Sequence, residues 1–140
     1  MLSPDTLLAN RYRVIRVLGE GGFGTIYLGH DEALDRNVAI KELLRDATRI
    51  SPQLWQQYQA RFVKEAQVMS QISHPHIVSA HALKADAEGN LYLVLEYVDG
   101  GSLKELIERS GVLPIERALN IAIDLCQAIE AIYQRDIVHR

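Results

Sequence analysis

The 140-residue sequence has few of the features that mark several protein classes. Its single cysteine, Cys126, cannot form an internal disulfide, so nothing favours a secreted, disulfide-stapled scaffold. No apolar run approaches the roughly 18 residues of a membrane-spanning helix, and Met1–Asp5 lacks the basic and apolar regions of a signal peptide. The formal net charge of -3 provides no strongly basic surface, which argues against nucleic acid as a partner. We therefore expect a cytoplasmic chain with no membrane segment of its own.

The residues that are present have an ordinary globular composition, with 48% hydrophobic and 24% charged residues. Their pattern predicts an α+β fold in which strands come first and helices last. Expected strands cover residues 12–18, 25–28, 38–41, 77–83 and 91–98, and expected helices cover residues 51–74, 102–107 and 114–134. The short connections between the first three strands favour an antiparallel sheet. The prediction is a five-stranded antiparallel sheet with one inserted helix, followed by two further helices.

A glycine-rich stretch, Gly19-Glu20-Gly21-Gly22-Phe23-Gly24, matches the pattern G-x-G-x-x-G. The pattern alone is weak and also describes a flexible turn. A Walker A loop would need Lys and then Ser or Thr after the last glycine, whereas Thr25 and Ile26 follow here. A dinucleotide-binding loop would need a helix at this point, whereas residues 25–28 have the composition of a strand. The remaining interpretation is a glycine loop at a hairpin tip that lies over phosphate groups.

A lysine closes the third predicted strand in the sequence Val38-Ala39-Ile40-Lys41. Strand alternation puts Ala39 and Lys41 on one face, where a flat ring could lie against the alanine and the ammonium could bind phosphate oxygens. Such a lysine needs a carboxylate partner to stay charged and oriented, and Glu65 on the inserted helix is the candidate. The alternative is that Glu65 is an exposed residue that pairs with Arg61.

These elements, in this order, resemble the start of a eukaryotic-type (Hanks-type) protein kinase domain, nearest to the bacterial serine/threonine branch. Leu18–Ile26 resembles the family's glycine-rich loop, Val38–Lys41 matches its third-strand lysine motif, and Glu65 occupies the place of its lysine-pairing glutamate. Further segments also resemble the family between the inserted helix and the helical lobe: His74–Val78, Leu91–Val98 and Asp99–Leu103. The resemblance implies an N-lobe over residues 11–98, preceded by an extension (1–10) and followed by the first helices of a C-lobe (99–140).

The resemblance implies that the chain binds ATP together with Mg²⁺. Lys41 would hold the α- and β-phosphates and would be oriented by Glu65. Leu95 would be the gatekeeper, and Ser102 would face the ribose. Adenine would lie between Leu18, Ile26 and Ala39, with its edge bonded to the backbone of Glu96 and Val98. The nucleotide-binding residues implied in this way are Leu18, Gly19, Glu20, Gly21, Gly22, Phe23, Gly24, Thr25, Ile26, Ala39, Lys41, Leu95, Glu96, Val98 and Ser102.

The last residues, His139 and Arg140, resemble the opening of the family's His-Arg-Asp catalytic loop. In the family, the catalytic aspartate and the two protein ligands of magnesium come after this point. We therefore expect no metal ligand within the 140 residues and little or no kinase activity from this polypeptide by itself. The resemblance implies that the parent enzyme transfers a phosphoryl group from ATP to serine or threonine of a protein substrate.

Two other functions remain alternatives to an enzyme fragment. The first is a non-catalytic nucleotide-binding or scaffolding module of the pseudokinase type, although Lys41, Glu65 and the glycine loop are intact and do not indicate a degenerate ATP site. The second is a dinucleotide-binding oxidoreductase domain, which the strand predicted directly after Gly24 disfavours.

The last predicted helix carries an apolar stripe, and we expect no other predicted element of this chain to cover it. The stripe consists of Ala118, Ile121, Leu125, Ile129 and Ile132. Because a large exposed apolar surface favours association, we expect self-association through this helix. Size-exclusion chromatography of the pure chain should show species larger than a monomer. A clean monomer whose last helix is protected from hydrogen exchange would contradict this expectation.

Overall fold

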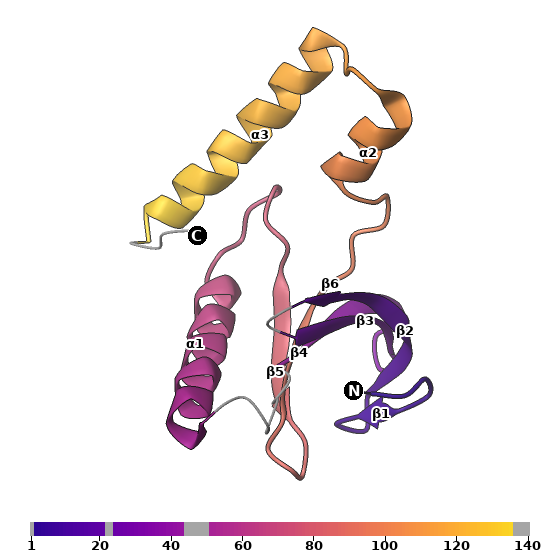
Figure 1. Ribbon diagram of the computed structural model, residues 1–140, viewed down its shortest axis with the longest axis vertical. Coiled ribbons are helices and arrows are strands. Elements are labelled where there is room, and N and C mark those ends of the chain that lie inside the picture. Colours follow the sequence, from indigo (N-terminus) through magenta and orange to yellow (C-terminus); the bar gives the residue numbers. More distant parts are fainter. Residues whose placement is uncertain (1, 22–23, 44–50, 136–140) are drawn as a thin grey trace. The chain divides into compact units, whose positions relative to one another are not determined.

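The computed structural model describes residues 2–21, 24–43 and 51–135. Within these ranges the chain forms, in order, β1 (Leu7–Leu8), β2 (Tyr12–Gly21), β3 (Gly24–Asp31), β4 (Arg36–Glu42), α1 (Pro52–Ser70), β5 (Ala80–Ala85), β6 (Leu91–Glu96), α2 (Leu103–Ser110) and α3 (Ile115–Tyr133) (Figure 1). The chain divides into two compact units. The first contains Met1–Gln71 and Ser79–Tyr97, and the second contains Ile72–Val78 and Val98–Arg140.

The first unit contains a curled, fully antiparallel sheet with the strand order β1-β2-β3-β4-β6-β5. The α+β fold and the antiparallel arrangement are confirmed, but the sheet has six strands among the described residues and not five. The additional strand, β1, has two residues and lies between left-handed backbone positions at Asp5, Ala9 and Asn10. A strand this short has no readable alternation of apolar and polar residues, which is why the sequence did not predict it.

Several element boundaries differ from those predicted. β2 and β3 continue into the glycine motif as far as Gly21 and from Gly24, because glycine tolerates extended backbone as well as turns. β5 begins at Ala80 and not at Ile77, and α1 ends at Ser70 and not next to Pro75. The helix start was predicted correctly. The Ser51 hydroxyl accepts a hydrogen bond from the Leu54 amide at 3.3 Å, ahead of a proline in the first turn.

Each face of the sheet carries its own hydrophobic cluster. The first cluster consists of Leu8, Tyr12, Val14, Tyr27, Val38, Ile40, Tyr92 and Val94, with Leu2 and Ala82 packed against it. The second cluster joins the sheet to α1 and consists of Leu43, Trp55, Phe62, Ala66 and Leu93. α1 therefore covers one face of the sheet, while the N-terminal segment lies on the other.

The second unit contains α2 and α3. α2 begins with a complete capping box, in which Ser102 and Glu105 satisfy each other's backbone amides. In the segment before β5, His76 Nε2 lies 3.3 Å from Asp124 Oδ1 of α3. Apolar side chains of α3 are largely exposed, among them Ile115, Leu119, Ile123, Leu125 and Ile129.

In the described part of the chain, no helix combines the length and apolar character that crossing a membrane requires.

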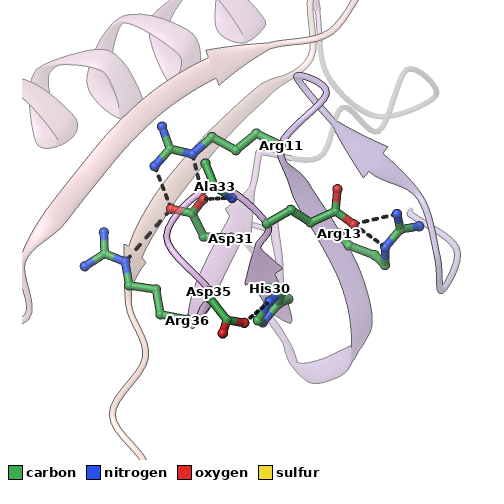
Figure 2. A network of polar contacts seen from close by, with 8 residues as sticks. Arg11, Arg13, His30, Asp31, Ala33, Asp35 and Arg36 are labelled. Atoms are coloured by element: carbon green, nitrogen blue, oxygen red, sulfur yellow. Dashed lines mark hydrogen bonds and ion pairs between the residues drawn. The ribbon is translucent and has the colours of Figure 1, made fainter.

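A buried carboxylate fastens the turn between β3 and β4 to the start of β2. Asp31, whose side chain is 1% exposed, accepts two hydrogen bonds from the Arg11 guanidinium, at 2.6 and 2.7 Å, and one from the Ala33 amide at 3.1 Å (Figure 2). Arg36 lies 3.9 Å away on the other side. The hydrogen bonds from Arg11 outweigh burial and lower the pKa of Asp31 to about 2.

We predict that Asp31→Asn lowers the free energy of unfolding at neutral pH by about 1.5–3 kcal/mol, because it weakens hydrogen bonds to a charged, buried group. The folded-state pKa of Asp31 lies below its ordinary value of 3.8, so its stabilisation is complete above that pH and is lost as the pH falls towards about 2. Urea denaturation at several pH values should therefore show a shallower acid loss in the variant than in the wild type.

The matched control is Glu32→Gln. Glu32 forms an exposed ion pair with Arg13, and exposed pairs contribute about 1 kcal/mol or less. Equal destabilisation by the two substitutions, or an unchanged acid profile in Asp31→Asn, would contradict the role given to Asp31.

Candidate functional site

Successive side chains of β4 point to opposite faces of the sheet, and this alternation determines which of them lie on the face covered by α1. Val38 and Ile40 are fully buried in the first cluster, whereas Ala39 and Lys41 are partly exposed on the opposite face. Lys41 stands between Ile26 on β3 and Leu93 on β6 in the strand register. The predicted orientation of the lysine is therefore present in the structure.

Lys41 and Glu65 form the ion pair that the sequence predicts. Lys41 Nζ donates to Glu65 Oε1 at 2.7 Å and lies 5.7 Å from the centre of the Phe62 ring. α1 sets this geometry because Phe62 and Ala66, the neighbours of Glu65 on the helix, are buried against the sheet. The alternative pairing of Glu65 with Arg61 is not the one that the structure contains.

The Lys41–Glu65 pair orients the lysine more than it stabilises the fold. The side chains are 24% and 47% exposed, respectively, and ion pairs in contact with solvent contribute about 1 kcal/mol or less. The Phe62 ring adds a weak cation–π attraction beneath the ammonium. Both contacts hold a positive charge at a fixed place on the sheet, where it can meet an anionic ligand.

A pocket of ≈ 250 Å³ adjoins this pair and is lined by Lys41, Leu43, Tyr58, Arg61, Phe62 and Glu65. The sequence analysis considered Arg61 only as an alternative partner of Glu65, and it identified neither Arg61 nor Tyr58 as a pocket residue. The signal was nevertheless available, because residues 58, 61, 62 and 65 have the i, i+3, i+4, i+7 spacing of one helix face.

The described glycines of the motif lie where β2 ends and β3 begins, with Gly19 opposite Ile26 and Gly21 opposite Gly24. Gly22 and Phe23 lie outside the described residues. Gly24 has a φ of +141°, and a Cβ added there would lie 1.9 Å from the carbonyl oxygen of Glu42. At Gly19 and Gly21, in contrast, an added Cβ would meet nothing within 4 Å. The fold therefore requires glycine at position 24, and the space over the other two is open.

Among the remaining predicted residues of the first unit, Ile26, Ala39 and Leu95 lie on the lysine face, whereas Thr25 is fully buried on the opposite face, across from Glu42. Ile26 faces Lys41 across the β3–β4 pair, and Ala39 faces Leu95 across the β4–β6 pair, so all four side chains share one side of the sheet. Leu18 lies at a register irregularity of β2 and has no cross-strand partner. Glu20 and Thr25 are opposite each other in the hairpin.

The residues predicted to contact the adenine edge and the ribose are divided between the two units. In the first unit, the Glu96 amide already donates to the Ser79 carbonyl at 2.9 Å, so a ligand contact through this residue must use its carbonyl oxygen. In the second unit, Val98 is exposed, and the Ser102 hydroxyl accepts the helix-capping bond from Glu105 at 3.2 Å. His139 and Arg140 lie outside the described residues.

No metal-binding cluster of His, Cys, Asp or Glu side chains occurs in the part of the chain that the structure covers. The chemistry that the described residues offer is the binding of an anion by an oriented ammonium beside an open glycine hairpin.

The sequence model for the protein kinase domain matches residues 12–140. The chain belongs to the protein kinase family. Among curated relatives, this kinase chain is 41% identical over 133 residues to the serine/threonine-protein kinase PrkC of Bacillus subtilis and 36% identical over 137 residues to PknB of Mycobacterium leprae. Both matches cover 95% of this chain but only 20% and 21% of the relatives, so the kinase chain spans about a fifth of their length.

Solved structures agree with this assignment. The Mycobacterium tuberculosis PknI kinase domain matches with a TM-score of 0.76 and 28% sequence identity, over 100% of this kinase chain and 54% of the PknI chain. The likeness to an N-lobe, which the sequence suggested through its motifs, thus extends to the path of the backbone.

We predict that Gly24→Ala destabilises the kinase chain by about 1–3 kcal/mol, because the methyl group would collide with the Glu42 carbonyl in a backbone conformation that L-residues rarely adopt. Gly21→Ala should leave the thermal midpoint almost unchanged, since its methyl group meets open space. Differential scanning calorimetry of both variants checks this. Equal shifts for the two would show that the hairpin does not approach Glu42 as described.

Proposed function

We propose that this chain is the ATP-binding portion of a serine/threonine protein kinase. The observation that carries the proposal is the 2.7 Å ion pair between Lys41 and Glu65, on the sheet face that continues to the glycine hairpin. The open space over Gly19 and Gly21 supports it, because the fold itself does not need glycine at these positions and a ligand that approaches the backbone closely does.

In this proposal the phosphates of ATP lie beside the described glycines of β2 and β3, Gly19, Gly21 and Gly24. Lys41 binds the α- and β-phosphate oxygens as a point charge, and Glu65 keeps the ammonium in place. Ile26 and Ala39, which share the lysine face, contact the adenine ring together with Leu18, and Leu95 is the gatekeeper behind the ring. The carbonyl of Glu96 completes the nucleotide contacts of the first unit.

Bound Mg²⁺ would neutralise phosphate charge, and we assign its protein ligands to the part of a kinase that follows the catalytic-loop motif. The reaction of the whole enzyme is transfer of the γ-phosphoryl group from ATP to a serine or threonine hydroxyl of a protein, which releases ADP. The contribution of the present residues is to bind and orient the nucleotide, which supplies a large part of catalysis in phosphoryl transfer.

We predict that Lys41→Met weakens binding of a non-hydrolysable ATP analogue about 10- to 100-fold, because a hydrogen bond to a charged group contributes about 1.5–3 kcal/mol. Glu65→Gln should have a smaller effect in the same direction, since the ammonium stays but loses its orienting charge. Isothermal titration calorimetry in the presence of Mg²⁺ measures both dissociation constants.

The matched control is Lys64→Met, which removes an exposed lysine next to Glu65 on the same helix. It should bind the analogue like the wild type. If Lys41→Met binds as tightly as the wild type, or if Lys64→Met loses as much affinity, the proposed site is wrong.

A further inference from the structure

A buried polar pair lies on the sheet face opposite Lys41 and has no part in the nucleotide site described above. Tyr27 is 0% exposed and Glu42 is 4% exposed, and Tyr27 Oη donates to Glu42 Oε2 at 2.5 Å. Burial and this hydrogen bond raise the pKa of Tyr27 to about 12, so the phenol stays protonated and remains a donor at physiological pH. Polar groups in an apolar cluster are costly unless they are bonded, which makes this pair a specific structural feature.

The position of Glu42 links this pair to both parts of the candidate site. Glu42 follows Lys41 directly on β4, so the backbone that bears one side chain bears the other. Glu42 is also opposite Thr25 in the β3–β4 register, and its carbonyl oxygen is the group that leaves no room for a side chain at Gly24. A shift of Glu42 would therefore move Lys41 and the base of the glycine hairpin together.

The N-terminal segment (residues 2–8) closes over the same pair. The Leu2 amide donates to Tyr27 Oη at 3.0 Å, and the Leu2 side chain packs against the first hydrophobic cluster. Farther along the segment, the Asp5 amide donates to the Val14 carbonyl at 2.8 Å, and β1 pairs with β2. The segment thus holds β2, the strand that leads into the glycine motif, and also reaches the Tyr27–Glu42 pair.

We propose that the N-terminal segment, Tyr27 and Glu42 form a clamp that fixes β4 and the base of the glycine hairpin. This clamp would hold the Lys41 ammonium in the position from which it binds phosphate. Tyr27 and Glu42 are positioning residues in this inference, since neither shares the face of the sheet that carries Lys41. The functional part of the inference rests on the proposed nucleotide site, whereas the mechanical part concerns only the described sheet.

A second buried tyrosine provides a matched control within the same cluster. Tyr92 Oη donates to Asp86 Oδ2 at 2.7 Å, and this carboxylate belongs to the β5–β6 turn. Tyr27→Phe and Tyr92→Phe each remove one buried hydroxyl that donates to a carboxyl group, so a purely structural role predicts similar effects of both. A clamp predicts that only Tyr27→Phe changes β3, β4 and nucleotide binding.

The test combines hydrogen–deuterium exchange without nucleotide and calorimetric titration with a non-hydrolysable ATP analogue and Mg²⁺. It compares the 140-residue wild type with Tyr27→Phe, Tyr92→Phe and a deletion of residues 2–4 that retains Met1. Tyr27→Phe and the deletion should speed amide exchange in residues 24–28 and 39–43, and weaken analogue binding, by about three- to tenfold. This is less than the full contribution of a hydrogen bond to a carboxylate, because these groups act on Lys41 only through the backbone. Tyr92→Phe should speed exchange only near the β5–β6 turn and bind the analogue like the wild type.

Each outcome decides one part of the inference. If Tyr27→Phe matches Tyr92→Phe in both measurements, the clamp is overturned. If Tyr27→Phe behaves as expected and the deletion behaves like the wild type, the N-terminal segment is excluded from it. If the wild type does not bind the analogue while the exchange differences persist, the proposed nucleotide function and the functional part of the inference fail, and the mechanical coupling is supported.

Discussion

The two-residue period of β4 is the constraint on which the rest of the structure depends. It sends Lys41 to the face covered by α1 and Glu42 to the face covered by the N-terminal segment, while one stretch of backbone carries both. The strand therefore connects an exposed, charged site to a buried, polar one. A one-residue slip in its register would exchange the two side chains and remove the functional face and the buried pair at once.

The helix and the sheet have different tasks at this site. The sheet sets the position and direction of the Lys41 side chain, because β4 is paired with a strand on each side, β3 and β6. α1 supplies the carboxylate and holds it in place with Phe62 and Ala66, which are buried against the sheet. Because the Lys41–Glu65 contact is partly exposed, its own strength is small, and its precision comes from the apolar contacts of the two elements that carry it.

Much of this arrangement could be predicted from the sequence, since it follows from patterns only a few residues long. The direction of Lys41 follows from strand alternation, and the place of Glu65 follows from the apolar positions around it on the helix. β1 was missed because a two-residue strand shows no alternation of apolar and polar residues. The Tyr27–Glu42 pair was missed because nothing in the sequence of β4 indicates that the side chain of its last residue, Glu42, is buried. The pairing depends on the register of β3 against β4 and on an N-terminal segment far away in the sequence, which only the folded chain brings together.

The three described glycines of the hairpin differ in what the fold requires of them. At position 24 the Glu42 carbonyl leaves no volume for a side chain, whereas no neighbouring atom restricts positions 19 and 21. A descendant that stopped binding a ligand would be free to drift at the outer two positions and would still be held at the inner one. Within this motif, loss of ligand binding should therefore lead to substitution of the glycines at positions 19 and 21, while the glycine at position 24 is retained because the fold requires it.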